Sequence, residues 1–126
     1  MLENDNRKAL NILRNFKTIN NSALEQEVAD IRVWANLGLY FAEKIKGGVA
    51  LQSYRVRGGQ QFKDQAVRHL ENALKYWIEV VAITKPLYNH MPLVHFSEQD
   101  GKHWKENDHL RFHWEVLRPE VAKDIE

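Results

Sequence analysis

The chain has 126 residues, enough for one domain with a single hydrophobic core and too few for two. Its 44 % hydrophobic and 28 % charged residues are typical of a folded globular protein and exclude wholesale disorder. The 18 Lys and Arg residues nearly balance the 17 Asp and Glu residues and leave a net charge of +1. This balance argues against nucleic acid or an anionic membrane as the main partner.

Cysteine is absent, which excludes disulfides, thiolate metal sites and cysteine nucleophiles. No apolar run approaches the ~20 residues that span a bilayer, so we expect a soluble protein. The N-terminus lacks the basic start and apolar stretch of a signal peptide. It begins abruptly in helix-compatible sequence, which suits either a cytoplasmic protein or a fragment of a longer chain.

The first predicted helix covers about residues 3–19, because apolar residues recur there at helical spacing. Those residues are Ala9, Leu10, Ile12, Leu13, Phe16 and Ile19. Asn20 and Asn21 are expected to end it. Ser22 and Glu25 then have the spacing of a capping box, which predicts the start of a second helix.

The second predicted helix, about residues 23–56, carries two apolar stripes. One contains Leu24, Val28, Ile31, Ala35, Ala42, Ile45 and Val49, and the other contains Trp34, Leu37, Phe41, Gly48 and Leu51. Two stripes predict a helix that is contacted on more than one side and is central to a bundle. Trp34 and Trp77 are both predicted to be core residues. Gly47 and Gly48 indicate either close approach of a neighbouring element or a kink.

A third helix is predicted over about residues 60–84. Its inward residues are Phe62, Ala66, Leu70, Ala73, Leu74, Trp77, Val80 and Val81. Gly58 and Gly59 form the tight link before it, which requires an antiparallel hairpin. The helix is expected to stop at Lys85 because the residue before Pro86 avoids the helical region.

The sequence changes character after Pro86. Residues 86–118 contain five of the six histidines and two of the four tryptophans. Residues 93–96 and 110–114 are short and partly alternating, which suggests a small hairpin across the polar segment 97–108. A short last helix is expected over 119–126, with Pro119 in its first turn.

The prediction is therefore an all-α fold in one domain, residues 1–126. Residues 1–85 form a three-helix antiparallel bundle, and residues 86–126 form an irregular Pro/His-rich tail with a short C-terminal helix.

No catalytic residue, metal ligand or cofactor site is assigned. The chain has no recognisable nucleophile–base pair, paired carboxylates or phosphate-binding loop, so the isolated chain is expected to be inactive. His109 and His113 have the i, i+4 spacing of metal ligands, but Arg111 between them disfavours a cation. A histidine-based metal binder remains the least favoured class.

Contact with a ligand or partner is predicted on the tail, between residues 88 and 114. Its imidazole and guanidinium groups can donate hydrogen bonds to hydroxyls or a uronate carboxylate, and its indoles can cover the apolar face of a sugar. The alternative is that these rings fasten the tail to the bundle. The candidate residues are Tyr88, His95, Trp104, His109, Arg111, His113 and Trp114.

Six stretches resemble the helical C-terminal region of large carbohydrate-active proteins of bacterial polysaccharide degraders, of the alpha-glucuronidase-like kind. They are Trp34–Ile45, Ala50–Arg55, Ala66–Trp77, Thr84–Tyr88, Phe112–Trp114 and Pro119–Ile125. The resemblance covers about residues 23–126.

The resemblance implies a non-catalytic accessory module of a polysaccharide-degrading enzyme. In such proteins the catalytic acids belong to an upstream barrel domain, so no catalytic residue carries over. The implied partner is the catalytic domain of the same parent chain, or an oligosaccharide. The implied compartment is periplasmic or extracellular. The alternative function is a free-standing helical protein-interaction domain.

Overall fold

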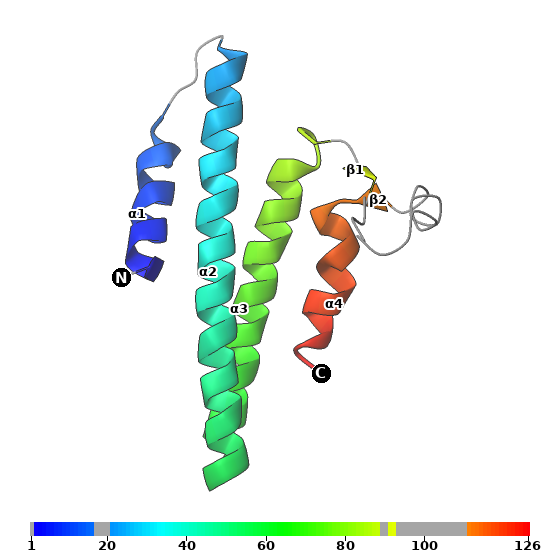
Figure 1. Ribbon diagram of the computed structural model, residues 1–126. Coiled ribbons are helices and arrows are strands. Elements are labelled where there is room, and N and C mark those ends of the chain that lie inside the picture. The colour runs from blue at the N-terminus through cyan, green and yellow to red at the C-terminus, as the bar shows by residue number, and fades with distance from the viewer. Residues whose placement is uncertain (1, 17–20, 89–90, 93–110) are drawn as a thin grey trace, which may run out of the picture.

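A computed structural model describes residues 2–16, 21–88, 91–92 and 111–126 of the chain. Helices dominate these ranges, which confirms the all-α prediction (Figure 1). In chain order, the helices are α1 (Leu2–Arg14), α2 (Ser22–Arg57), α3 (Gln60–Thr84), the 3₁₀ helix η2 (Trp114–Leu117) and α4 (Arg118–Lys123). The predicted extents of the second and third helices are confirmed.

The two longest helices, α2 and α3, form an antiparallel hairpin that is the centre of the fold (Figure 1). The turn between them needs two residues with positive φ, and glycine adopts this conformation without a Cβ penalty. Gly58 has φ 70° and Gly59 has φ 93°. The Gly58 N–H donates to the Tyr54 carbonyl at 2.8 Å and so closes the last turn of α2. Helix α3 ends at Thr84, at the predicted boundary, but Lys85 keeps helical angles and its N–H donates to the Val81 carbonyl, so the predicted reason for the boundary is wrong.

The start of α2 corrects the predicted capping box. Asn21, not Ser22, is the N-cap, because its backbone is extended and its side-chain oxygen accepts a hydrogen bond from the Leu24 N–H at 3.1 Å. Ser22 is already the first helical residue.

Helix α1 ends at Arg14, earlier than the predicted end at 19. Asn15 and Phe16 donate instead to carbonyls three residues back, at 3.4 and 3.3 Å, which tightens the chain into a turn. Asparagine favours helix ends because its side chain competes for backbone hydrogen bonds. The predicted part of this helix over 17–20 lies outside the described residues.

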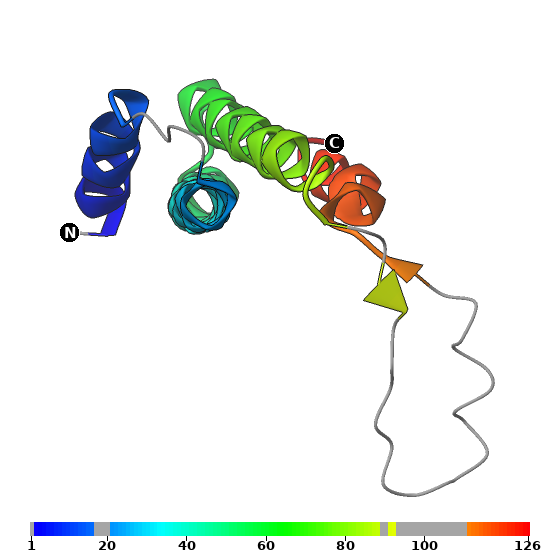
Figure 2. The same ribbon diagram turned by 90° about the horizontal axis from the view of Figure 1, so that it is seen from above.

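The hydrophobic core lies where α2, α3 and the C-terminal helices meet. Its buried residues are Val33, Leu37, Tyr40, Ala73, Trp77, Val80, Val81 and Val121. Trp77 is only 5 % exposed, which confirms its predicted core position. Figures 1 and 2 show α4 beside α3, on the side away from α1. The tail therefore returns to the hairpin and completes the core through Val121.

Two short strands precede the C-terminal helices. Strand β1 (Met91–Pro92) pairs antiparallel with β2 (Arg111–Phe112). This pairing resembles the predicted hairpin, but the first strand lies just before the predicted residues 93–96, which are outside the described residues. Trp114 was expected in the second strand and begins η2 instead. The His113 side chain caps that turn, because Nδ1 accepts from the Glu115 N–H at 3.1 Å. Helix α4 begins at Arg118 and ends at Lys123, before the predicted end at 126.

Helix α2 runs without a break through both glycines of the Gly47–Gly48 pair (Figure 1). A Cβ on Gly47 would lie 3.0 Å from the Leu70 side chain of α3. Gly47 therefore permits the close approach of α3, which is the first of the two predicted possibilities. Gly48 has no such neighbour: a Cβ there would meet no heavy atom within 4 Å.

Candidate functional site

The structure describes only part of the predicted contact region on the tail. His95, Trp104 and His109 lie outside the described residues. Arg111 is described through its backbone pairing with Pro92. Tyr88, His113 and Trp114 are described with their side chains: Tyr88 contacts α2, Trp114 contacts α3, and His113 caps η2.

Trp114 packs against the core residue Trp77. The two ring centroids lie 5.6 Å apart with the rings edge to face, and the Trp77 indole N–H donates to the Trp114 carbonyl at 3.1 Å. These contacts match the fastening role that the sequence left open for this ring. They hold η2 against α3, which positions the tail.

We expect Trp114→Ala to lower the free energy of unfolding by about 2–3 kcal/mol, somewhat less than the loss of a fully buried tryptophan, because Trp114 is half-buried. Thermal and urea unfolding measure this loss. Val116→Ala in the same 3₁₀ helix is the control, since Val116 is exposed, and should change stability little. Equal stabilities of the two variants would contradict the fastening role.

Tyr88 joins the end of α3 to the start of α2. Its hydroxyl donates to the Asp30 carboxylate and accepts a hydrogen bond from the Gln26 amide at 2.9 Å. The hydrogen bond to Asp30 raises the pKa of Tyr88, because only the neutral phenol can donate it. His113 is buried and caps η2. Tyr88 and His113 thus hold local structure rather than lining one shared site.

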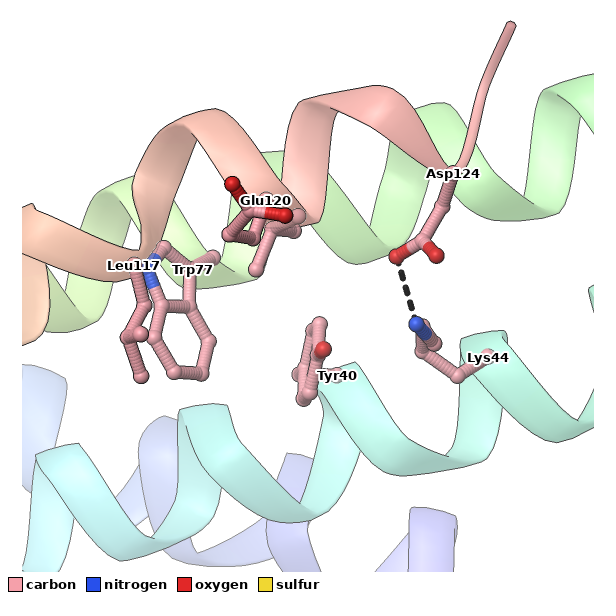
Figure 3. A pocket seen from close by; sticks show the side chains of 7 residues that line it. Tyr40, Lys44, Trp77, Leu117, Glu120 and Asp124 are labelled. Carbon is pink, nitrogen blue, oxygen red and sulfur yellow. Dashed lines mark hydrogen bonds and ion pairs between the residues drawn. The ribbon is translucent and has the colours of Figure 1, made fainter.

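A shallow cavity of about 370 Å³ lies between α2, α3 and α4 (Figure 3). Tyr40, Trp77 and Val121 give it an apolar floor, and Lys44 and Asp124 stand at its edge. The Lys44 ammonium and the Asp124 carboxylate form an ion pair at 2.5 Å. Burial lowers the pKa of Lys44, but the hydrogen bond to Asp124 and the interactions with the Tyr40 hydroxyl and the Asp124 charge together outweigh burial, and the net pKa is raised. The charges of Lys44 and Asp124 already pair with each other, so neither is left unpaired to bind a ligand in the cavity.

The strongest polar cluster surrounds Glu43, a carboxylate that is buried between α2 and α3. It accepts hydrogen bonds from Lys46 at 2.9 Å and Asn72 at 3.4 Å, and its other contact is His69 Nδ1 at 2.8 Å. Lys46 also pairs with Glu3 of α1 at 2.6 Å. The cluster therefore ties three helices together.

Burial raises the pKa of Glu43, but hydrogen bonds from His69 and Lys46 outweigh this, and the pKa is lowered. The carboxyl thus stays charged at neutral pH. Within the described residues, no three His, Cys, Asp or Glu side chains converge as metal ligands. What the contacts of the Glu43 cluster show is a link between α1, α2 and α3.

The outstanding surface feature is the side of α2 that no described helix covers, which borders a cavity of about 320 Å³ lined by Ile45 and Val49 together with Phe62 of α3. Its large apolar side chains are between 46 % and 73 % exposed. We call this surface the outer face of α2; it consists of Ile31, Trp34, Phe41, Ile45, Val49 and Val56. Figure 2 looks along α2 and shows α1 and α3 on two sides of it, with none of the described helices over the remaining side.

Trp34 corrects a prediction, because it was expected in the core and is 73 % exposed. Neither predicted stripe of α2 is wholly buried, because Ile31, Ile45 and Val49 of the first stripe are exposed, whereas Leu37 of the second is only 5 % exposed. Helical spacing shows that Trp34 and Phe41 share a face, and it does not show whether that face meets the same chain. The helical spacing of Trp34 and Phe41 was visible in the sequence. Sequence reasoning assigned these residues to the core of the bundle and not to a surface that binds a partner.

Comparisons with known proteins assign no family. No family model, no curated protein and no solved structure matches the chain. The carbohydrate-active resemblance therefore stays a prediction. No described helix is both long enough and apolar enough to cross a membrane. The fold and its surface define a helical hairpin with a fastened C-terminal segment and one uncovered apolar face.

Proposed function

We propose that this protein is a helical protein-interaction module that docks through the outer face of α2. The observation that carries the proposal is the row of large apolar side chains left exposed along this helix. An amphipathic surface helix normally turns its polar side to water, whereas α2 is apolar on both sides. Contiguous exposed apolar surface of this kind marks interaction sites, and aromatic residues are enriched in the centres of interfaces.

The composition of the outer face also favours a protein partner over a sugar. Trp34 and Phe41 are aromatic, but their neighbours Ile31, Ile45 and Val49 are aliphatic and supply no hydrogen bonds. Sugar sites need polar groups that fix hydroxyls, and protein interfaces need a continuous apolar centre. The accessory-module hypothesis is compatible with this surface if a catalytic domain is what covers it.

Site-specific cross-linking in the cells that make the protein tests the proposal. A photoreactive phenylalanine analogue in place of Trp34 should cross-link to a protein, either a second copy or a different chain, identified by mass spectrometry. The matched control carries the same analogue in place of Lys63, an exposed residue of α3. A Trp34 sample that yields no more protein adducts than the Lys63 sample would overturn the proposed function.

A further inference from the structure

We propose that the outer face of α2 binds a second copy of this chain, with the two α2 helices antiparallel and a two-fold axis passing at Phe41. This inference rests on the proposed function and names the partner. Three observations support it: a self-complementary row of exposed residues, an exposed glycine that the chain itself does not use, and the extent of the apolar surface.

The row consists of every seventh residue of α2 and is exposed along its whole length. Its members, in order, are Glu27, Trp34, Phe41, Gly48 and Arg55. Seven residues make almost two turns of an α-helix, so positions at this spacing drift by only about 20° per step, and a slight left-handed coiling of the pair keeps them in contact. Two helices that pair along such lines contact each other in a regular sequence of layers.

The row is complementary to a second copy of itself that runs in the opposite direction. In a two-fold antiparallel pair, residues equally far from Phe41 on either side face each other, and every contact occurs twice. Glu27 then faces Arg55 of the second copy, which pairs opposite charges. Trp34 faces Gly48, which places the largest side chain over the smallest, and Phe41 meets itself on the axis.

A parallel pair would lose all of this complementarity. It would set Glu27 against Glu27 and Arg55 against Arg55, and like charges across an interface are unfavourable. It would also crowd Trp34 against Trp34 and leave a gap between two Gly48 residues. The order of charges and volumes along the row therefore selects the antiparallel arrangement.

Gly48 is independent support for close approach at this surface. A glycine in a helix interior costs about 1 kcal/mol relative to alanine, so its presence calls for a reason. Gly38 and Gly47 have reasons within the chain, because a Cβ on them would lie 2.1 Å from the Asn6 side chain and 3.0 Å from Leu70. Gly48 is exposed with nothing near it, and a second α2 helix supplies the missing neighbour.

The outer face is large enough for a stable dimer. From Glu27 to Arg55 the helix is about 42 Å long, at 1.5 Å per residue. Its six apolar side chains expose on the order of 600 Å² in each chain, and flanking side chains add to this. A standard interface buries about 800 Å² per partner, which the pair of helices can supply.

The first experiment measures the mass of the purified full chain by sedimentation equilibrium between about 1 and 100 µM, the range in which micromolar dimers dissociate. We expect twice the chain mass of 14.9 kDa at the upper end. Phe41→Glu should give a monomer with unchanged helical circular dichroism. Val116→Glu is the control, because Val116 is exposed in η2, away from this face, and it should stay dimeric.

The second experiment tests the antiparallel register by charge exchange. Glu27→Arg and Arg55→Glu each put like charges in both outer layers, so each variant should dimerise at least about tenfold more weakly. An equimolar mixture restores opposite charges in both layers and should recover the wild-type affinity as a heterodimer. Glu71→Arg, on an exposed position of α3, should leave dimerisation unchanged.

Three results would overturn the dimer: a monomeric wild-type chain at every concentration, a Phe41→Glu variant that still dimerises, or single charge variants that dimerise like wild type. These failures are distinguishable from failure of the proposed function. A monomeric chain whose position 34 cross-links to a different protein would refute the dimer and retain the interaction module. Absence of any cross-link at position 34 would refute the interaction module itself.

Discussion

Trp77→Ala is expected to lower the free energy of unfolding by about 3–5 kcal/mol, whereas Trp34→Ala should change it by less than about 0.5 kcal/mol. The two substitutions remove the same side chain from two neighbouring helices. Trp77 is 5 % exposed, lies 5.0 Å from the Tyr40 ring and 5.6 Å from the Trp114 ring between centroids, and donates a hydrogen bond to the Trp114 carbonyl. Trp34 is 73 % exposed and contributes little to the monomer.

Urea and thermal unfolding at low micromolar concentration, where association contributes least, measure this difference. If Trp77→Ala does not fold at all, Trp77→Phe keeps most of the packing and should fold with an intermediate loss of stability. Equal losses at Trp34 and Trp77 would mean that the outer face of α2 belongs to the core of the same chain, contrary to the structure.

Glu43→Gln is expected to lower stability by about 2 kcal/mol at pH 7, because it removes a buried charge that accepts hydrogen bonds from three side chains, including the Lys46 ammonium. It should also flatten the acid side of the stability profile. The folded-state pKa of Glu43 lies below the ordinary carboxyl value of 4.5. The unfolded chain therefore takes up this proton first, and Glu43 stabilises the fold above that value. This contribution is lost as the pH falls through the lowered folded-state pKa.

Chemical unfolding between pH 7 and pH 3 checks both parts of this prediction. Glu71→Gln is the matched control, since Glu71 is exposed on α3 and should leave the profile unchanged. A Glu43→Gln chain that loses as much stability on acidification as wild type would show that the hydrogen bonds from Lys46 and His69 do not stabilise the charged carboxylate.

The sequence predicted the central hairpin well because its boundaries are set locally. Helix α3 ends before Pro86 because proline has no backbone N–H to continue the helical hydrogen bonds. Lys85 itself keeps helical angles, φ −56° and ψ −42°, so the expectation that the residue before proline avoids this region is wrong. Gly58 and Gly59 mark the turn because few other residues adopt positive φ. The N-cap of α2 was predicted one residue late because Asn21 and Ser22 are both good caps, and the extended backbone at Asn21 decides between them.

The candidate site could be predicted only in part. Composition directed attention to the tail, where Trp114 packs on Trp77 and His113 caps a helix. Those rings were identified as either a site or a fastening, and composition could not choose because both uses need aromatic and imidazole groups. The surface on which the proposed function rests was visible in the sequence as the stripe of Trp34 and Phe41, but it was assigned to the core.

The sequence by itself determined the helices, the lengths of the two longest ones and which residues share a face, because each of these follows from short-range sterics and helical periodicity. Only the tertiary structure decided which face of α2 meets its own chain. That choice depends on where α1 and α3 pack: α3 takes the side of Leu37 and Tyr40, and Gly38 lies against Asn6 of α1. The side of α2 that carries Trp34 and Phe41 is left exposed. Burial depends on residues far apart in the chain. A stripe of apolar residues therefore looks the same in the sequence whether it packs in the core or forms an interface.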